Sequence, residues 1–182
     1  MVALGLIFIC VLVFLLQNIE IVTNYAMITG LDFVEPWRFI TSMFLHADFS
    51  HLFFNMFALL MFGPYLERKV GSTMFLSIYL LSGIIGGLGF ELFSQPGVLG
   101  LGASGAIYGI FGALVVLEPK MVVYLYFVPV PITVAAVFYA LIELVSMGAI
   151  DNIGHAAHLF GLMGGYFLAI IHKRMRSDDV WS

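Results

Sequence analysis

Long apolar stretches separated by short polar clusters run along almost the whole chain. Residues 1–19 carry no charged side chain, and the later stretches end at charged or turn-forming residues such as Glu67-Arg68-Lys69 and Glu118-Pro119-Lys120. A helix crosses the hydrocarbon layer with about 20 apolar residues. The pattern therefore predicts six transmembrane helices in a single domain covering residues 1–182, with helices at about 3–22, 50–66, 72–92, 104–117, 131–147 and 153–172.

The composition supports an all-α membrane protein. Of the 182 residues, 62% are hydrophobic and only 10% are charged, and the mean hydropathy is +1.09, whereas ordinary globular chains contain about 25% charged residues. The residue alternation of a membrane β-barrel is absent. A net charge of −4 without a basic patch argues against a nucleic-acid partner, so the lipid bilayer is the expected environment.

The basic residues predict how the chain is oriented. With six spans, the loops after the second and fourth helices lie on the same side as both termini. Six basic residues fall on that side, and Arg38 is the one that falls opposite; the six are Arg68, Lys69, Lys120, Lys173, Arg174 and Arg176. Since cytoplasmic loops are enriched in Lys and Arg, we expect a multi-pass protein of the cell membrane with both termini in the cytoplasm.

Four polar residues fall at a similar depth in three of the predicted helices. His51 precedes Arg68 by 17 residues, Ser104 precedes Lys120 by 16, and His158 lies 15 before Lys173. At the helical rise these distances are roughly 22–26 Å, below the outer edge of a layer about 30 Å thick. Asn55 is one turn deeper than His51 on the same face. Polar groups at such depth normally face a bundle interior or a watered cavity.

The fourth predicted helix is too short to span the membrane. Residues 104–117 extend about 21 Å, so the helix begins inside the bilayer after the glycine-rich stretch 100–103. A serine at the start of a helix is usually an N-cap. A cap alone does not explain a helix that begins at this depth, where its positive dipole end would stabilise negative charge near Ser104.

Small residues predict that the fourth and sixth helices approach closely. One face of the fourth carries Gly105, Gly109 and Gly112, and one face of the sixth carries Gly154, His158, Gly161 and Gly165. Small residues at this spacing allow membrane helices to pack tightly. If the two faces meet, the His158 ring comes within hydrogen-bonding range of Ser104, and Tyr108 packs against that ring. The site would open toward the outside of the cell.

These residues together resemble the rhomboid family of intramembrane serine proteases, in its minimal prokaryotic form with six helices. The matching features, in order over residues 36–172, are Trp37-Arg38, His51-x-x-x-Asn55, Leu66-Glu67-Arg68, Gly102-Ala-Ser104-Gly105 with Tyr108, and Ala157-His158-Leu-Phe-Gly161. The resemblance implies a six-helix bundle with a short central fourth helix and an interfacial first loop. Trp37 and Arg38 are expected to anchor that loop.

The resemblance also implies roles for individual residues. Ser104 would be the nucleophile and His158 its general base, without an aspartate. His51, Asn55 and the Ser104 backbone N–H would form the oxyanion hole, and the supporting residues would be Gly102, Gly105, Tyr108 and Gly161. Substrates would be transmembrane segments of other membrane proteins, cleaved near the outer face, and no cofactor or metal would be required.

We expect no carboxylate beside His158. Asp151 lies two turns away toward the outside, while Glu143 and Glu91 are interpreted as boundary residues near the ends of their helices. The stacking of Tyr108 would orient His158 instead. His46 and His172 are expected to be interfacial side chains without a role.

Three other interpretations remain open. A metal site built from His46, His51, His155 and His158 is conceivable, but a His-Glu-x-x-His pattern is absent. A catalytically silent relative could bind transmembrane segments as a chaperone or adaptor, although the Ser104–His158 pair argues against it. A transporter is the third interpretation, because broken helices within the membrane also occur at transport sites.

The fifth helix and residues 148–153 are expected to form a movable gate for substrate, because Pro131 and Gly148 lie at the two ends of that helix.

Overall fold

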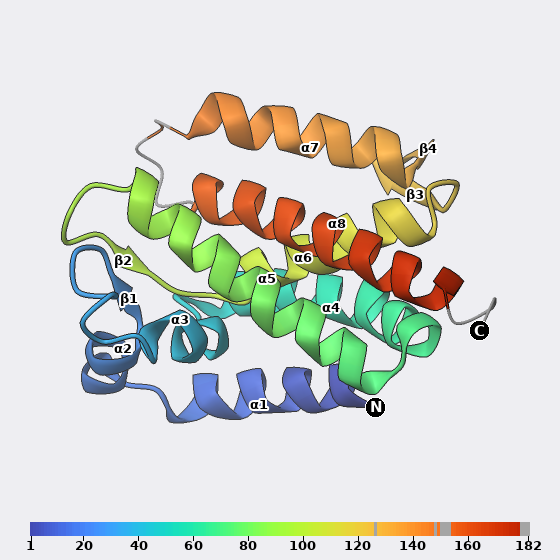
Figure 1. The fold of residues 1–182 in the computed structure, drawn as a ribbon. Coiled ribbons are helices and arrows are strands. Elements are labelled where there is room, and N and C mark those ends of the chain that lie inside the picture. The colour runs from blue at the N-terminus through green and yellow to red at the C-terminus, as the bar shows by residue number, and fades with distance from the viewer. Residues whose placement is uncertain (126, 148, 150–153, 179–182) are drawn as a thin grey trace.

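The apolar stretches form helices in the computed structural model, which describes residues 1–125, 127–147, 149 and 154–178 (Figure 1). The long helices are α1 (Val2–Leu16), α4 (Phe49–Val70), α5 (Ser72–Phe93), α6 (Ser104–Leu117), α7 (Ile132–Ser146) and α8 (His155–Asp178). Shorter elements are the helices α2 (Ile19–Tyr25) and α3 (Arg38–Thr41), the 3₁₀ turn η1 (Ser42–Phe44) and the strands β1 (Met27–Ile28), β2 (Leu99–Gly100), β3 (Val122–Leu125) and β4 (Val128–Pro131).

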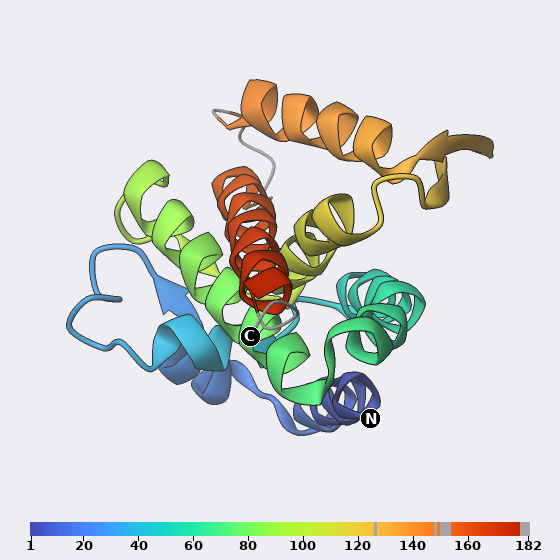
Figure 2. The same ribbon diagram turned by 45° about the vertical axis from the view of Figure 1, so that its right-hand side comes forward.

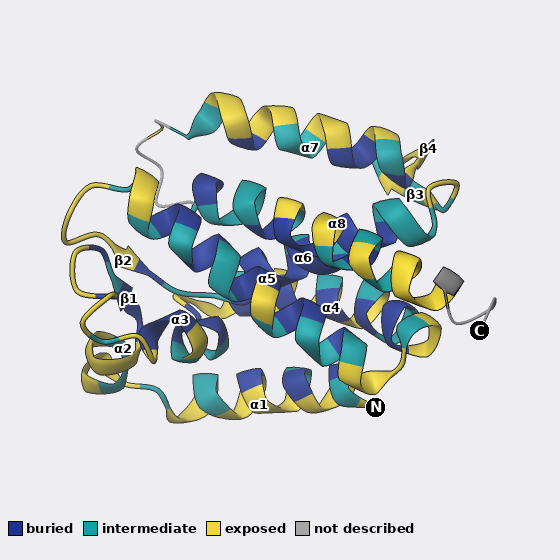
Figure 3. Ribbon diagram, viewed as in Figure 1, coloured by how far each residue is buried: buried dark blue, intermediate teal, exposed yellow. Residues whose placement is uncertain are grey.

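Helix α6 lies at the centre of the bundle. It packs most extensively against α8 and α5, and also contacts α4 and α7. Helices α1 and α7 lie on opposite sides of this central group in both ribbon views (Figures 1 and 2). Burial follows the same arrangement: the middle of the bundle is buried, whereas α1 and α7 are largely exposed (Figure 3). Such exposed apolar surface is what a bilayer would cover.

Among the described residues, two helices meet the length and composition of a membrane span. These are α4 and α5, whereas α1, α6 and α7 are apolar but shorter. The boundaries of α6 coincide with the predicted residues 104–117, and α5 differs from its prediction by a single residue. Helix α8 continues beyond the expected end at 172, to Asp178. The structure is thus predominantly helical, as the composition predicts.

Helix α4 also continues beyond its expected end at 66, to Val70, and two further segments differ from the prediction. The first helix was expected to continue to residue 22, but α1 ends at Leu16. There the Gln17 amide donates to the His46 backbone carbonyl (2.5 Å), and Asn18 starts α2 by accepting from the Ile21 N–H (2.9 Å). The second difference is that β3 and β4 pair antiparallel before α7, where the sequence pattern did not predict strands.

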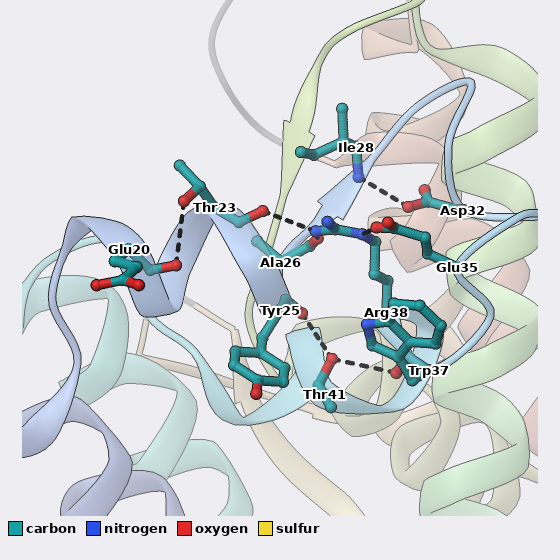
Figure 4. A network of polar contacts seen from close by, with 10 residues as sticks. All are labelled: Glu20, Thr23, Tyr25, Ala26, Ile28, Asp32, Glu35, Trp37, Arg38 and Thr41. Carbon is teal, nitrogen blue, oxygen red and sulfur yellow. Dashed lines mark hydrogen bonds and ion pairs between the residues drawn. The ribbon is translucent and has the colours of Figure 1, made fainter.

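Arg38 ties the first loop together, as expected for an anchoring residue. Its guanidinium is buried, donates to the backbone carbonyls of Thr23 (2.9 Å) and Ala26 (2.5 Å), and pairs with Glu35 (2.5 Å; Figure 4). Trp37 beside it remains about half exposed. A short ladder between β1 and β2 joins this loop to the segment before α6, so the first loop braces the backbone that leads to Ser104.

Asp32 gives the first loop a dependence on pH. Its side chain is fully buried, and one oxygen accepts from the Ile28 N–H at 2.8 Å (Figure 4). Burial, together with the carboxyl group of Glu91, raises the pKa of Asp32 to about 6. A raised folded-state pKa favours the protonated fold, so this contribution to stability is complete at low pH and is lost as the pH rises through about 6.

We therefore expect Asp32→Asn to stabilise the protein at neutral pH. Asparagine imitates the protonated acid, keeps the bond from Ile28 and can donate to Glu91. The gain should be about 1–2 kcal/mol near pH 7.5 and should vanish near pH 4. Thermal unfolding in detergent at both pH values measures it. Asp32→Ala should lose stability at both, and a benefit of Asp32→Asn that does not change with pH would contradict this explanation.

Candidate active site

Ser104 is the first residue of α6, and its hydroxyl does not cap the helix. The N-cap position is Ala103, without a side-chain cap. The backbone reaches this point through Gly102, which has φ +121°, a region that residues with a side chain rarely adopt. The Gly102 N–H donates to the Ser42 carbonyl at 2.9 Å. The serine hydroxyl is therefore available to a side chain from another helix.

Glycines bring α8 against α6 at backbone contact. A Cβ atom added to Gly161 would lie 2.1 Å from the Gly105 carbonyl oxygen, and one added to Gly165 would lie 1.8 Å from that of Gly109. The two faces predicted to meet do so. Gly154 does not take part, because it precedes α8 and a Cβ there would make only ordinary contacts.

This approach places His158 beside Ser104. The His158 Nε2 and Ser104 Oγ atoms are 2.7 Å apart. The Tyr108 ring, one turn below Ser104, stacks on the His158 ring with centroids 4.4 Å apart and an interplanar angle of 3°. A hydroxyl bonded to an imidazole whose ring is held in place is the arrangement that nucleophilic catalysis by serine requires. The positive end of the α6 dipole points at the same place.

A carboxylate also contacts His158, which corrects our expectation. Glu143 of α7 is 5% exposed, and its Oε1 lies 3.0 Å from the His158 Nδ1. The same oxygen accepts from the Tyr108 hydroxyl (2.5 Å), while Oε2 lies 2.6 Å from Nδ1 of His155. Glu143 is therefore part of the site and not a boundary residue. Asp151, the other carboxylate considered, lies outside the described residues.

The sequence contains a signal for Glu143 as a residue of the site. Glu143 is the single charged residue of α7, and it shares the buried face of that helix with Ile132, Ala135 and Ala136. An ionisable residue on an inward face of an apolar helix indicates a functional site with a partner. Glu91 differs, because it accepts from the Gly30 N–H (2.9 Å) at the first loop, outside this cluster.

His51 and Asn55 lie at the loop that precedes Ser104. The His51 ring packs against Gly102 so closely that a Cβ atom there would lie 2.6 Å from its Cε1. The Asn55 amide is buried and donates to the His51 carbonyl at 2.8 Å. Asp48 caps α4 by accepting from the His51 N–H (2.8 Å), which fixes the first turn of that helix.

The remaining histidines do not form a metal cluster in the described part of the chain. There, no group of three or more His, Cys, Asp or Glu side chains is arranged to hold a metal ion. His46 was expected at the interface but is fully buried, with its ring 5.2 Å from that of His51. Burial lowers the pKa of His46 to about 4, so the ring is neutral around pH 7.

Comparisons with known proteins identify the family. A profile of the rhomboid domain matches residues 34–175. The rhomboid protein YdcA of Bacillus subtilis (strain 168) is 38% identical over 154 residues, covering 84% of this chain and 74% of YdcA. Rhomboid protease GluP of the same organism is 39% identical over 74% of this chain but only 26% of GluP.

A third relative covers almost the whole chain. Rhomboid protease GlpG of Haemophilus influenzae is 28% identical over 182 residues, which is 94% of this chain and 90% of GlpG. The profile match includes the Ser104 and His158 segments, and the YdcA similarity extends over most of the chain. The chain therefore belongs to the rhomboid family and is a membrane protein with relatives named as proteases.

Proposed function

We propose that the chain is an intramembrane serine endopeptidase that cleaves transmembrane segments of other membrane proteins near the outer membrane face. The observation that carries this proposal is the 2.7 Å contact between Ser104 Oγ and His158 Nε2 inside an apolar helical bundle. Membership of the rhomboid family supports it. The proposed reaction needs no cofactor or metal.

In the proposed reaction His158 is the single base. Its Nε2 takes the proton of Ser104 as the Oγ attacks the scissile carbonyl carbon, and the imidazolium then gives that proton to the leaving amine. Water then attacks the resulting ester: His158 Nε2 takes a proton from the water and gives it to Ser104 Oγ as the ester bond breaks. A positioned base of this kind is worth about 10²–10⁴ in rate.

The proposed oxyanion hole consists of the His51 and Asn55 side chains and the Ser104 backbone N–H. Each donor fixed where charge develops can contribute roughly 10²–10³ in rate. An asparagine amide carries two N–H donors, and the bond to the His51 carbonyl engages one of them. Gly102, Gly105 and Gly161 would support the site by permitting the close backbone contacts, and Tyr108 by stacking on His158.

The proposed topology has six spans, α1, α4, α5, α6, α7 and α8, with both termini in the cytoplasm. Two contacts support the placement of the N-terminus and the C-terminal ends of α4 and α6 on the same side of the membrane. Glu67 accepts from the backbone N–H groups of Val2 and Ala3 (2.7 and 2.9 Å), and Lys69 pairs with Glu118. Ser104 then opens toward the outside.

Substrate access past α7 remains a prediction. A groove of about 500 Å³ separates α7 from α6 and α8, and among its lining residues are Val115, Ala136 and Met163. Such an apolar groove suits a transmembrane helix. Gly148 and residues 150–153 of the proposed gate lie outside the described residues, whereas Pro131 immediately precedes α7.

Serine labelling and cleavage test the proposal together. The full chain in liposomes is incubated with a single-pass membrane protein as reporter, with or without a fluorophosphonate probe. We expect the unlabelled protein to cleave the reporter within its transmembrane segment and the labelled protein to be inactive. Mass spectrometry should find the probe attached to Ser104. A chelator should have no effect. Inhibition by the chelator would point to a metal, and reporter binding without labelling or cleavage would indicate a silent adaptor instead.

A further inference from the structure

Glu143 is a buried carboxylate with three hydrogen-bonding groups around it. Its Oε1 meets the Tyr108 hydroxyl and Nδ1 of His158, and its Oε2 meets Nδ1 of His155. Burying a carboxylate is costly unless hydrogen bonds and partner charges compensate for the lost water. Both oxygens are used, and the partners come from α6 and α8. The position of the carboxylate is therefore fixed by three contacts.

These contacts select one form of the His158 ring. An ionised carboxylate only accepts hydrogen bonds, so the His158 Nδ1 at 3.0 Å from it must carry the proton. A neutral imidazole has one N–H, which leaves Nε2 with a lone pair facing the Ser104 hydroxyl at 2.7 Å. Accepting the serine proton then creates an imidazolium beside a negative charge.

We propose that Glu143 is a positioning residue for the Ser104–His158 pair, which it serves by holding His158 in the tautomer with an unprotonated Nε2. The inference rests on the proposed proteolytic function. Tyr108 links the two partners, because it stacks on His158 and donates to the same Glu143 oxygen. Since Glu143 belongs to α7 at the edge of the bundle (Figure 2), the position of α7 and the orientation of His158 are coupled.

Kinetics of Glu143→Gln test the role. Glutamine keeps the size of the side chain but removes the charge, and its amide can turn an N–H toward His158 and favour the wrong tautomer. We expect kcat for the reporter to fall about 10–100-fold, which is a part of the rate enhancement that a positioned base contributes. KM should change less than about twofold. Glu143→Asp retains the charge and should give a higher kcat than Glu143→Gln.

Glu91→Gln is the matched control. It makes the same change in a half-buried carboxylate at the first loop, outside the His158 cluster. Its kcat should equal that of the unmodified protein. If Glu143→Gln is folded and has the kcat of the unmodified protein, the inference is wrong.

A spectrum of the unmodified protein decides the matter if the variants do not fold. With ¹⁵N-labelled histidine, the His158 signal, assigned by its absence in His158→Asn, should report a protonated Nδ1 and an unprotonated Nε2. The opposite tautomer would overturn the inference even if the protein is an active protease. Absence of cleavage and of Ser104 labelling in the unmodified protein would instead reject the proposed function, while the tautomer would still test the contact with Glu143.

Discussion

Replacing either Ser104 or His158 by alanine is expected to reduce cleavage of a transmembrane reporter to the rate without enzyme. The loss should be at least about 10³-fold in kcat/KM, because each change removes the nucleophile or its base. The two atoms are 2.7 Å apart, so the residues should act as a unit. The double variant should accordingly be no worse than either single one.

The fold should survive both changes. The Ser104 hydroxyl does not cap α6, so Ser104→Ala should alter the free energy of unfolding by less than about 0.5–1 kcal/mol. Thermal unfolding in detergent measures the stability of each variant, alongside its rate of reporter cleavage. Ser82→Ala is the matched control, because Ser82 Oγ is buried without a partner among the described residues; its rate should be unchanged. Full activity of Ser104→Ala or His158→Ala would reject the dyad.

The pairing of Ser104 with His158 could be predicted because few physical rules control it. Residues 104–117 between a glycine-rich stretch and Glu118-Pro119 give a helix too short to span, and α6 has those bounds. Glycines at every third or fourth position leave little freedom in which faces of α6 and α8 meet. The stacking of Tyr108 on His158 follows from the same helical spacing.

The features that were missed depend on contacts between distant segments. The break after Leu16 follows from the bond between Gln17 and the backbone of His46, 29 positions away. The burial of His46 has the same origin, since other parts of the chain cover Leu45 and His46 while the rest of the loop before α4 stays exposed. Helical periodicity contains no information on either contact.

Glu143 was missed for a different reason. Its position near one end of an apolar helix suits a residue at the membrane boundary as well as a residue of the site. The choice depends on which face of α7 turns toward α8, and α7 contains no glycine face that would fix this in advance. The alanines at 135 and 136 were the available indication, because small residues mark the contact side of a membrane helix.

Gly165→Ala is expected to be strongly destabilising, although it adds one methyl group. The new Cβ would lie 1.8 Å from the Gly109 carbonyl oxygen and 2.4 Å from its carbon, both of which belong to the α6 backbone. A backbone cannot give way as the end of a side chain can, so α8 must move away from α6. Overpacking of this kind costs about 1–3 kcal/mol or more.

Gly164→Ala is the matched control on the adjacent residue. Its Cβ would meet the Ile85 side chain at 3.1–3.4 Å, which a small rotamer shift relieves, so thermal stability should change by less than about 1 kcal/mol. Gly165→Ala should also lower reporter cleavage, because moving α8 separates His158 from Ser104, and a misplacement of 1 Å can cost about 10²-fold in rate. Equal stability and activity of the two variants would mean that backbone contact between α6 and α8 does not set the geometry of the site.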